Sequence, residues 1–359
     1  MSKLYKLPLR QSILTLFCVL FMAISVAGPA AAQSDGTFVI GEISSIPGGS
    51  IPSSGIPTSP VSTPTSVPAT LTPSATPSAP VASRQLSFRA SLAELGYVEG
   101  KNLTYIFDAQ SIASDKLDAA AQRLVEAHVN IIVAYGTQAS VAARKAVEGT
   151  NIPVVFVGPV DPVQLGLVKS LQNTEGNVTG VGGVAEAYAK QLELMIQIVP
   201  TIHKIYLPYP NLTNPITAAS VQAIQDFAKK SGVEVITAIV PTTDDVAAAI
   251  AAMPDVDAIM VLAFTPSGFV QAALDRKIPV SGAFPGTVNS GSLLSYNYTE
   301  DGVGSAAARF ADRILRGAKP SDLPVEIAPS VFAINIKTAD AIGLTIPDDI
   351  LQQAAIIVR

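Results

Sequence analysis

The sequence predicts an α/β protein with two doubly wound parallel-sheet domains. Short apolar runs rich in β-branched residues alternate with Ala-rich stretches of helical length, which is the pattern of βαβ units with right-handed crossovers. The strand runs are mostly apolar on both faces, as expected for a sheet that helices cover on both sides. The alternation forms two series that meet near residues 180–186, and each series is long enough for one domain.

The apolar runs predict nine strands, at Leu103–Phe107, Ile131–Ala134, Val154–Val157, Val178–Val181, Ile205–Leu207, Val233–Ile239, Ala258–Leu262, Val280–Ala283 and Ser292–Tyr296. The Ala-rich stretches predict helices at Leu86–Leu95, Lys116–Ala127, Ala139–Val147, Tyr188–Ile198, Ala218–Lys230, Asp244–Ala252 and Val303–Arg316. We also predict that Thr37–Ile43 is the first strand of the first sheet. The alternative is that residues 33–84 are all tail.

Residues 1–32 have the three parts of a secretory signal peptide. Lys3, Lys6 and Arg10 form a basic start, residues 13–26 are apolar and uncharged, and an A-x-A cleavage pattern covers residues 30–32. The apolar run is shorter than the about 20 residues of a membrane span. We therefore expect export to the periplasm or the cell surface. Cleavage of the signal is favoured over the alternative of an uncleaved anchor.

Charge and composition exclude several classes of function. The 359 residues carry a formal net charge of -5, with one cysteine and two histidines. Without the three basic residues of segment 1–32, the charge is -8, from 20 basic and 28 acidic residues. No basic run is available for phosphate binding, so we expect no nucleic-acid partner. No G-x-S-x-G or H-E-x-x-H motif is present, so we expect no enzyme activity, no metal and no cofactor.

Residues 46–84 are predicted to be an extended linker or insert rich in Pro, Ser and Thr. No residue between Glu42 and Arg84 is charged, and nine of the 27 prolines fall between Pro47 and Pro80. Such a segment cannot fill a core, because its prolines lack backbone donors and its other residues are small. We expect a solvated spacer.

Three loops follow predicted strands, at the edge where ligands of open α/β sheets bind. In the first loop, Gly136 permits close backbone approach and Thr137 is predicted to be the N-cap of the next helix, whose free N–H groups favour a carboxylate or phosphate. In the second, Asp161 is either the partner of an ammonium group or an N-cap before Pro162. In the third, Tyr209 is either a ligand contact or part of a Pro-stiffened turn.

Other motifs favour structural roles. The run from Gly180 to Gly183 is half of a dinucleotide fingerprint, and we interpret it as a crossover between the domains. The acid pairs at residues 244–245 and 348–349 are predicted to cap helix N-termini.

At this point the residues resemble a known family. The string Gly96-Tyr97-Val98-Glu99-Gly100-Lys101-Asn102 is similar to a segment of the ABC-transporter substrate-binding proteins often called TrpX-like. Further similar segments follow in order at residues 136–137, 153–162, 177–181, 317–326 and 334–344, so the resemblance covers the chain from residue 87 onward.

The resemblance implies a type I periplasmic-binding-protein fold, with two Rossmann-like doubly wound lobes joined by a multi-crossing hinge. It implies that lobe 1 comprises residues 33–45, 85–184 and 297–328, and that lobe 2 comprises residues 185–296 and 329–359. The function implied is delivery of a small-molecule solute, such as an aromatic or other amino acid, to an ABC permease in the membrane. We expect a monomer.

On this interpretation Gly136, Thr137 and Gln138 hold the carboxylate of the solute, and Asp161 holds its amine. The other predicted contacts are the walls and one polar group near the hinge: Tyr209, Phe264, Phe284, Tyr296 and Asn297. The sequence departs from the family in the linker beside the cleft, in a short segment at residues 265–277, and in Tyr209, where Asn is common. The alternatives are a sensing or scaffold module of the same fold, a secreted α/β enzyme, or a paralogue that no longer binds a ligand.

Overall fold

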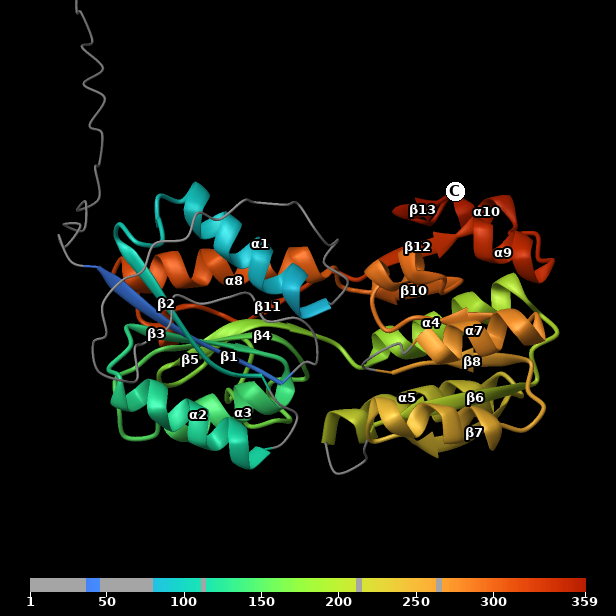
Figure 1. Cartoon of the computed structure of the whole chain (residues 1–359), viewed down its shortest axis with the longest axis horizontal. Helices are drawn as coiled ribbons and strands as arrows, with labels where there is room; N and C mark the ends of the chain where they lie inside the picture. The colour runs from blue at the N-terminus through green and yellow to red at the C-terminus, as the bar shows by residue number, and fades with distance from the viewer. Residues whose placement is uncertain (1–36, 46–79, 111–113, 211–214, 263–266) are drawn as a thin grey trace, which may run out of the picture. The chain divides into compact units, whose positions relative to one another are not determined.

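The computed structural model describes residues 37–45, 80–110, 114–210, 215–262 and 267–359, which form two parallel-sheet lobes (Figure 1). None of the helices in these ranges has the length and apolar character needed to cross a membrane. The predicted signal segment, nearly all of the predicted linker, and Phe264 lie outside the described residues.

The first lobe is built on a six-stranded sheet in the order β11-β5-β4-β3-β1-β2, with parallel pairing throughout. Its strands are β1 (Phe38–Ser44), β2 (Leu103–Gln110), β3 (Ile131–Tyr135), β4 (Val154–Val160), β5 (Val178–Gly183) and β11 (Glu326–Ile327). Its helices are α1 (Pro80–Glu94), α2 (Ser114–Glu126), α3 (Thr137–Ala146), α8 (Glu300–Leu315) and the short 3-10 helix η3 (Pro320–Asp322).

Side chains of the central strands pack alternately on the two faces of this sheet. Ile131, Val133 and Tyr135 join the core beneath α1 and α8, whereas Ile132 and Ala134 join the core of α2 and α3. Figure 1 shows these two helix pairs on opposite sides of the sheet. Helices on both faces explain why the strands are apolar at every position.

The second lobe has a seven-stranded sheet in the order β13-β12-β10-β9-β8-β6-β7, in which only the β10–β12 pair is antiparallel among the described strands. Its strands are β6 (Lys204–Tyr209), β7 (Glu234–Ile239), β8 (Ala258–Met260), β9 (Val280–Ser281), β10 (Leu294–Asn297), β12 (Val331–Asn335) and β13 (Ile356–Val358). Its helices are α4 (Glu186–Ile198), α5 (Pro215–Lys230), α6 (Val246–Ala251), α7 (Ser267–Arg276), α9 (Ile336–Ile342), α10 (Asp348–Leu351), and the 3-10 helices η1 (Thr243–Asp245) and η2 (Pro285–Ser290).

All nine predicted strands and the strand expected at residues 37–43 are present, the last as β1 in the middle of the first sheet. Helix α1 starts at Pro80, six residues before the predicted start at Leu86. The interpretation of Gly180–Gly183 as a crossover is wrong, because these residues complete strand β5 and pair with β4. Gly180 packs so closely on β4 that a Cβ would lie 2.2 Å from the carbonyl oxygen of Phe156.

Each sheet reverses its strand order at one point. In the first sheet the reversal falls between β1 and β3, and in the second between β6 and β8. Loops diverge at such a point beyond the carboxyl ends of the strands, which leaves room for a ligand. The two reversal points therefore define where the site residues should be sought.

Candidate functional site

The carboxyl ends of β1 and β3 are tied together at the reversal point of the first sheet. Both the backbone N–H and the hydroxyl of Ser45 donate to the carbonyl of Tyr135, at 2.9 and 3.2 Å. The next residue, Gly136, donates its N–H to the carbonyl of Val157 on β4, at 2.9 Å. Three strand ends thus converge within a few residues of Gly136.

Gly136 is the N-cap of α3, so the prediction that Thr137 is the cap is wrong. Its φ of 86° lies in the left-handed region, which glycine adopts without steric cost, and no side chain caps the helix. Thr137 and Gln138 are half-buried in the first turn, where backbone N–H groups have no intrahelical acceptor. The end of α3 can therefore donate hydrogen bonds to an anionic group.

Asp161 follows the end of β4 on the same edge of the sheet. Its Oδ1 accepts a hydrogen bond from the N–H of Gln164, at 3.1 Å, and its own N–H donates to Gly183. Its φ is 48°, and a turn rather than a helix follows Pro162. The helix N-cap alternative is therefore wrong, because Asp161 closes a turn instead. Among the described residues no group donates to its second carboxylate oxygen.

The predicted residues of the second lobe are held mostly within that lobe. Tyr209 ends β6, pairs with Ile239 on β7 and is buried in the lobe's core, so the turn predicted there is absent up to this residue. Tyr296 is half-buried on β10, and its N–H donates to Gln191. Asn297 is buried, and its amide donates to the carbonyl of Ala283 at 3.0 Å.

A cluster that the sequence did not reveal lies beside Gly158, within the carboxyl-terminal half of β4. The guanidinium of Arg84, on α1, lies 4.8 Å from the ring centre of Phe284 and 5.5 Å from that of Tyr298. The Tyr298 hydroxyl donates to the carbonyl of Gly158 at 2.7 Å. Arg84 Nη2 lies 4.0 Å from Glu300 Oε1 at the start of α8. One predicted contact, Phe284, thus lies against Arg84 and Tyr298, two residues that were not predicted.

Gly158 is required for this arrangement. Its φ is 78°, and a Cβ would lie 2.8 Å from the Tyr298 hydroxyl and 2.9 Å from Arg84 Nη1. Any side chain there would be strained and would displace both groups.

Burial sets the charge states in the cluster. Burial raises the pKa of Glu300 to about 7, although the positive charge of Arg84 opposes the rise. Burial also raises the pKa of Tyr298, which keeps its hydroxyl protonated and able to donate. Arg84 itself is 1% exposed.

Arg84 could not be assigned from sequence because it lies next to the uncharged, Pro-rich segment. It is the first charged residue after Glu42, and that was the only signal that distinguished it. Glu300 and Tyr298 had no such signal in the sequence. For Glu300 this is because an acid in the first turn of a helix is common.

A second buried charge pair lies deeper in the first lobe. Glu42 on β1 is fully buried, forms an ion pair with Arg89 on α1, and accepts a hydrogen bond from the Tyr135 hydroxyl at 2.9 Å. Burial raises the pKa of Glu42 despite the neighbouring Arg89. Arg89 also covers the ring of Tyr105, at 4.1 Å. These contacts fix α1 on the sheet, so this pair has a structural role.

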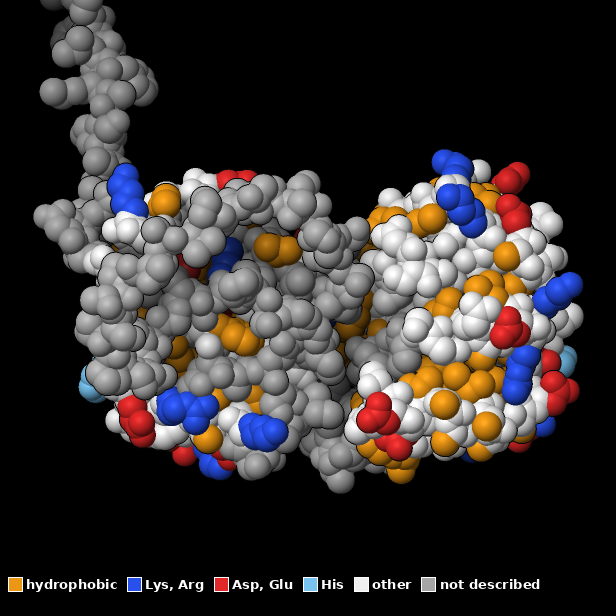
Figure 2. All heavy atoms as spheres, viewed as in Figure 1, with side chains coloured by type: hydrophobic (Ala, Val, Ile, Leu, Met, Phe, Trp, Pro, Cys, Tyr) orange, Lys and Arg blue, Asp and Glu red, His pale blue; other side chains and the backbone are white. Residues whose placement is uncertain are grey.

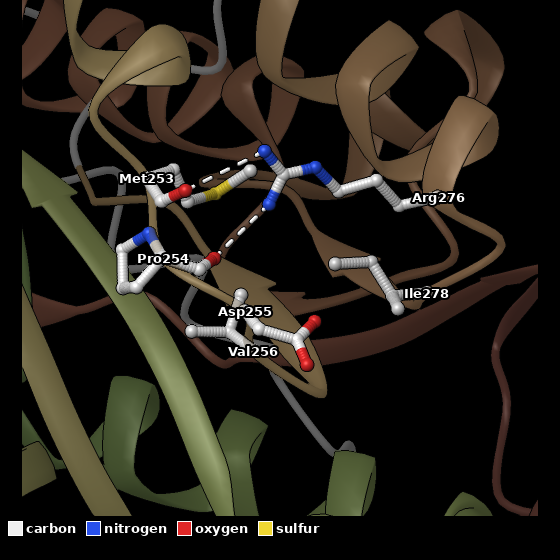
Figure 3. Close-up of a pocket in the computed structure, with 6 residues that line it drawn as sticks. All are labelled: Met253, Pro254, Asp255, Val256, Arg276 and Ile278. Atoms are coloured by element: carbon white, nitrogen blue, oxygen red, sulfur yellow. Dashed lines mark hydrogen bonds between the residues drawn. The ribbon is translucent and has the colours of Figure 1, made fainter.

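A pocket of about 460 Å³ lies away from these residues, at the amino ends of β8 and β9 (Figure 3). Arg276 crosses it and donates to the carbonyls of Pro254 and Met253, at 3.0 and 3.5 Å. Asp255 also lines the pocket and is exposed. Because ligands of such sheets bind at the carboxyl ends, this pocket is on the wrong edge.

The described residues offer no group of three or more His, Cys, Asp or Glu side chains that could hold a metal ion. On the face shown in Figure 2, Lys and Arg side chains are scattered among acidic ones and form no basic stripe.

A comparison with protein-family models identifies the family of the chain. The model of the ABC transporter substrate binding protein family matches residues 82–358. The chain belongs to this family. Proteins of the family are solute-binding proteins of ABC transporters and are typically extracytoplasmic.

Individual relatives agree with the family. A curated relative, the tyrosine-binding protein of Clostridioides difficile strain R20291, is 28% identical over 266 residues, which are 72% of this chain and 75% of the relative. An ABC domain from Streptococcus pneumoniae, solved in complex with L-Trp, matches this structure with a TM-score of 0.74 at 24% sequence identity. The match covers 90% of this chain and 100% of the S. pneumoniae chain. A solute binding protein from Bacillus halodurans with bound myo-inositol has a TM-score of 0.57 at 13% identity, with 89% and 98% covered. The expected type I periplasmic-binding-protein fold is confirmed.

Proposed function

We propose that this ABC solute-binding protein binds an amino acid, with aromatic amino acids as the first candidates, in the cleft between its lobes. The observation that carries the proposal is the uncapped start of α3 at the reversal point of the first sheet. It combines free backbone donors with the carboxylate of Asp161 on the next strand end. The names of the C. difficile and S. pneumoniae proteins, which bind Tyr and Trp, support this ligand class.

In this proposal Gly136, Thr137 and Gln138 donate to the carboxylate of the solute, and Asp161 accepts from its ammonium group. The remaining predicted contacts, Tyr209, Phe264, Phe284, Tyr296 and Asn297, shape the cleft. The chain is exported by residues 1–32, acts as a monomer and delivers the solute to an ABC permease. The lobe boundaries are those expected from the sequence (lobe 1 residues 33–45, 85–184 and 297–328, and lobe 2 residues 185–296 and 329–359), except that α1 extends lobe 1 back to Pro80 and β10 places Asn297 in lobe 2. Closure of the lobes is favoured because the ligand contacts both at once.

The experiment is a thermal-shift screen of the chain without residues 1–32, which contains every described element. The panel is the twenty amino acids together with myo-inositol. A ligand at about 100 times its Kd stabilises the native state by about 2.7 kcal/mol, or several degrees for a protein of this size. We expect the largest shift with Tyr, Trp or Phe.

Two variants locate the ligand. Asp161→Asn keeps an acceptor for the Gln164 N–H and tolerates the positive φ, so it removes little besides the charge. We expect it to reduce the shift strongly. Asp255→Asn removes an exposed acid at the pocket on the opposite strand edge and should leave the shift unchanged. A shift that depends on Asp255 instead, or that only myo-inositol produces, would contradict the proposal.

A further inference from the structure

Two buried charged groups beside Gly158 have unfilled hydrogen-bonding capacity. Among the described residues, neither Nε nor Nη2 of Arg84 has a hydrogen-bond partner, and Oε1 of Glu300 has none. Arg84 Nη2 and Glu300 Oε1 are 4.0 Å apart, which is beyond hydrogen-bond distance. Unpaired N–H donors of Arg84 therefore lie next to an unpaired acceptor oxygen of Glu300.

Leaving these groups unpaired is costly, because a buried charge without a full set of hydrogen bonds loses its hydration without compensation. The surroundings nevertheless hold the guanidinium in place. The rings of Phe284 and Tyr298 both lie within cation–π distance, and Gly158 leaves the room that Nη1 occupies. A guanidinium that is held in position but lacks hydrogen-bond acceptors is typical of a ligand-binding residue.

The cluster lies on the same strand edge as the proposed solute site. Gly158 follows Val157 within β4, and the Val157 carbonyl accepts the N–H of Gly136, which directly follows the neighbouring strand β3. A ligand at the start of α3 is therefore one strand away from Arg84.

We infer that Arg84 and Glu300 bind the two charged ends of a zwitterionic amino acid, with the carboxylate on Arg84 and the ammonium on Glu300. The inference rests on the proposed function and narrows its ligand class to solutes that carry both charges. A carboxylate has about four acceptor positions, so it can accept from Arg84 and from the N–H groups of α3 together. An ammonium has three donors, which Glu300 and Asp161 can share.

Binding at Glu300 should be accompanied by a measurable release of protons. The charged and titratable groups that act on Glu300 and its surroundings in the described residues are Arg84, Asp301 and Tyr298. With a pKa of about 7, Glu300 is about half protonated at neutral pH. An ammonium bound beside it favours the carboxylate, so binding at pH 7 should release up to about half a proton.

The test is isothermal titration of the chain without residues 1–32 with L-tyrosine and L-tryptophan, at pH 7 in phosphate and in Tris. The two buffers differ in ionisation enthalpy and so report the proton release. We expect Arg84→Met to weaken binding about 10- to 100-fold, as expected for loss of a hydrogen bond between charged groups. Arg84→Lys should lose less, and Glu300→Gln should abolish the proton release. Tyramine and 3-(4-hydroxyphenyl)propionate, which each lack one charge, should bind wild type at least tenfold more weakly than tyrosine.

Arg313→Gln, which removes an exposed arginine near the end of the same helix α8, is the control and should bind as wild type does. Circular dichroism checks that Arg84→Met is folded. If it is not folded, the inference is tested by the affinities of tyramine and 3-(4-hydroxyphenyl)propionate for wild type and by the proton release of Glu300→Gln. Unchanged affinity in folded Arg84→Met, with wild type still binding an amino acid, would overturn this inference alone. A wild-type chain that binds neither Tyr nor Trp, and shows no shift with any of the twenty amino acids in the thermal screen, would overturn the amino-acid part of the proposed function as well.

Discussion

At the scale of single residues, Glu300 links the charge state of the protein to its stability. Its pKa of about 7 in the folded chain lies above the ordinary value of 4.5, and burial is the main cause. The folded state therefore binds more protons than the unfolded state between these two pH values. Stability from this group is fully present below about pH 4.5 and is lost as the pH rises through 7.

Glu300→Gln should therefore flatten the dependence of stability on pH. The shift corresponds to at most about 3 kcal/mol, which wild type should lose between pH 5 and pH 8 relative to the variant. Urea unfolding at several pH values measures the difference. Some slope should remain, since the pKa of Glu42 is raised in the same direction. Parallel pH profiles for wild type and Glu300→Gln would contradict the assigned pKa.

At the scale of elements, α1 depends on the ion pair between Glu42 and Arg89. Residues 46–79 separate this helix from β1 in the sequence, and its own side chains pack it on the sheet. Phe88 and Leu92 are fully buried in the core that α1 shares with α8, and Arg89 adds the charge contact to β1. The position of α1 on the sheet is thus set by these side-chain contacts.

Replacing Glu42 by Gln should cost about 3 kcal/mol of unfolding free energy, because it leaves the largely buried guanidinium of Arg89 with only the more distant and more exposed Glu99 as a counter-charge. The control is Glu148→Gln, which breaks an exposed pair with Arg144 on α3 and should cost less than about 1 kcal/mol. Urea midpoints of the two variants give the comparison. Equal losses would mean that the buried pair contributes no more than the surface pair.

At the scale of the whole molecule, the fold was accessible from the sequence because both sheets are covered by helices. The strands Ile131–Tyr135 and Val154–Val160 are apolar throughout, and that pattern marks them without reference to distant residues. The short strands β11 to β13 were not predicted, because runs of two to five residues carry little periodicity.

The site was accessible only in part. Glycine and polar residues after a strand end mark Gly136 and Asp161, since the carboxyl edge of a parallel sheet is where ligands bind. Arg84, Tyr298 and Glu300 come from α1 and from the start of α8, more than 200 residues apart in the sequence. Only the folded chain brings them to Gly158, and no spacing rule connects them.

Binding of an amino acid is tested by native mass spectrometry of the chain without residues 1–32, after dialysis against an equimolar mixture of the twenty amino acids and myo-inositol. We expect the protein to retain one amino acid at a ratio of one to one, and the Asp161→Asn variant to retain much less. Retention of myo-inositol alone, or of no solute by the folded protein, would contradict it.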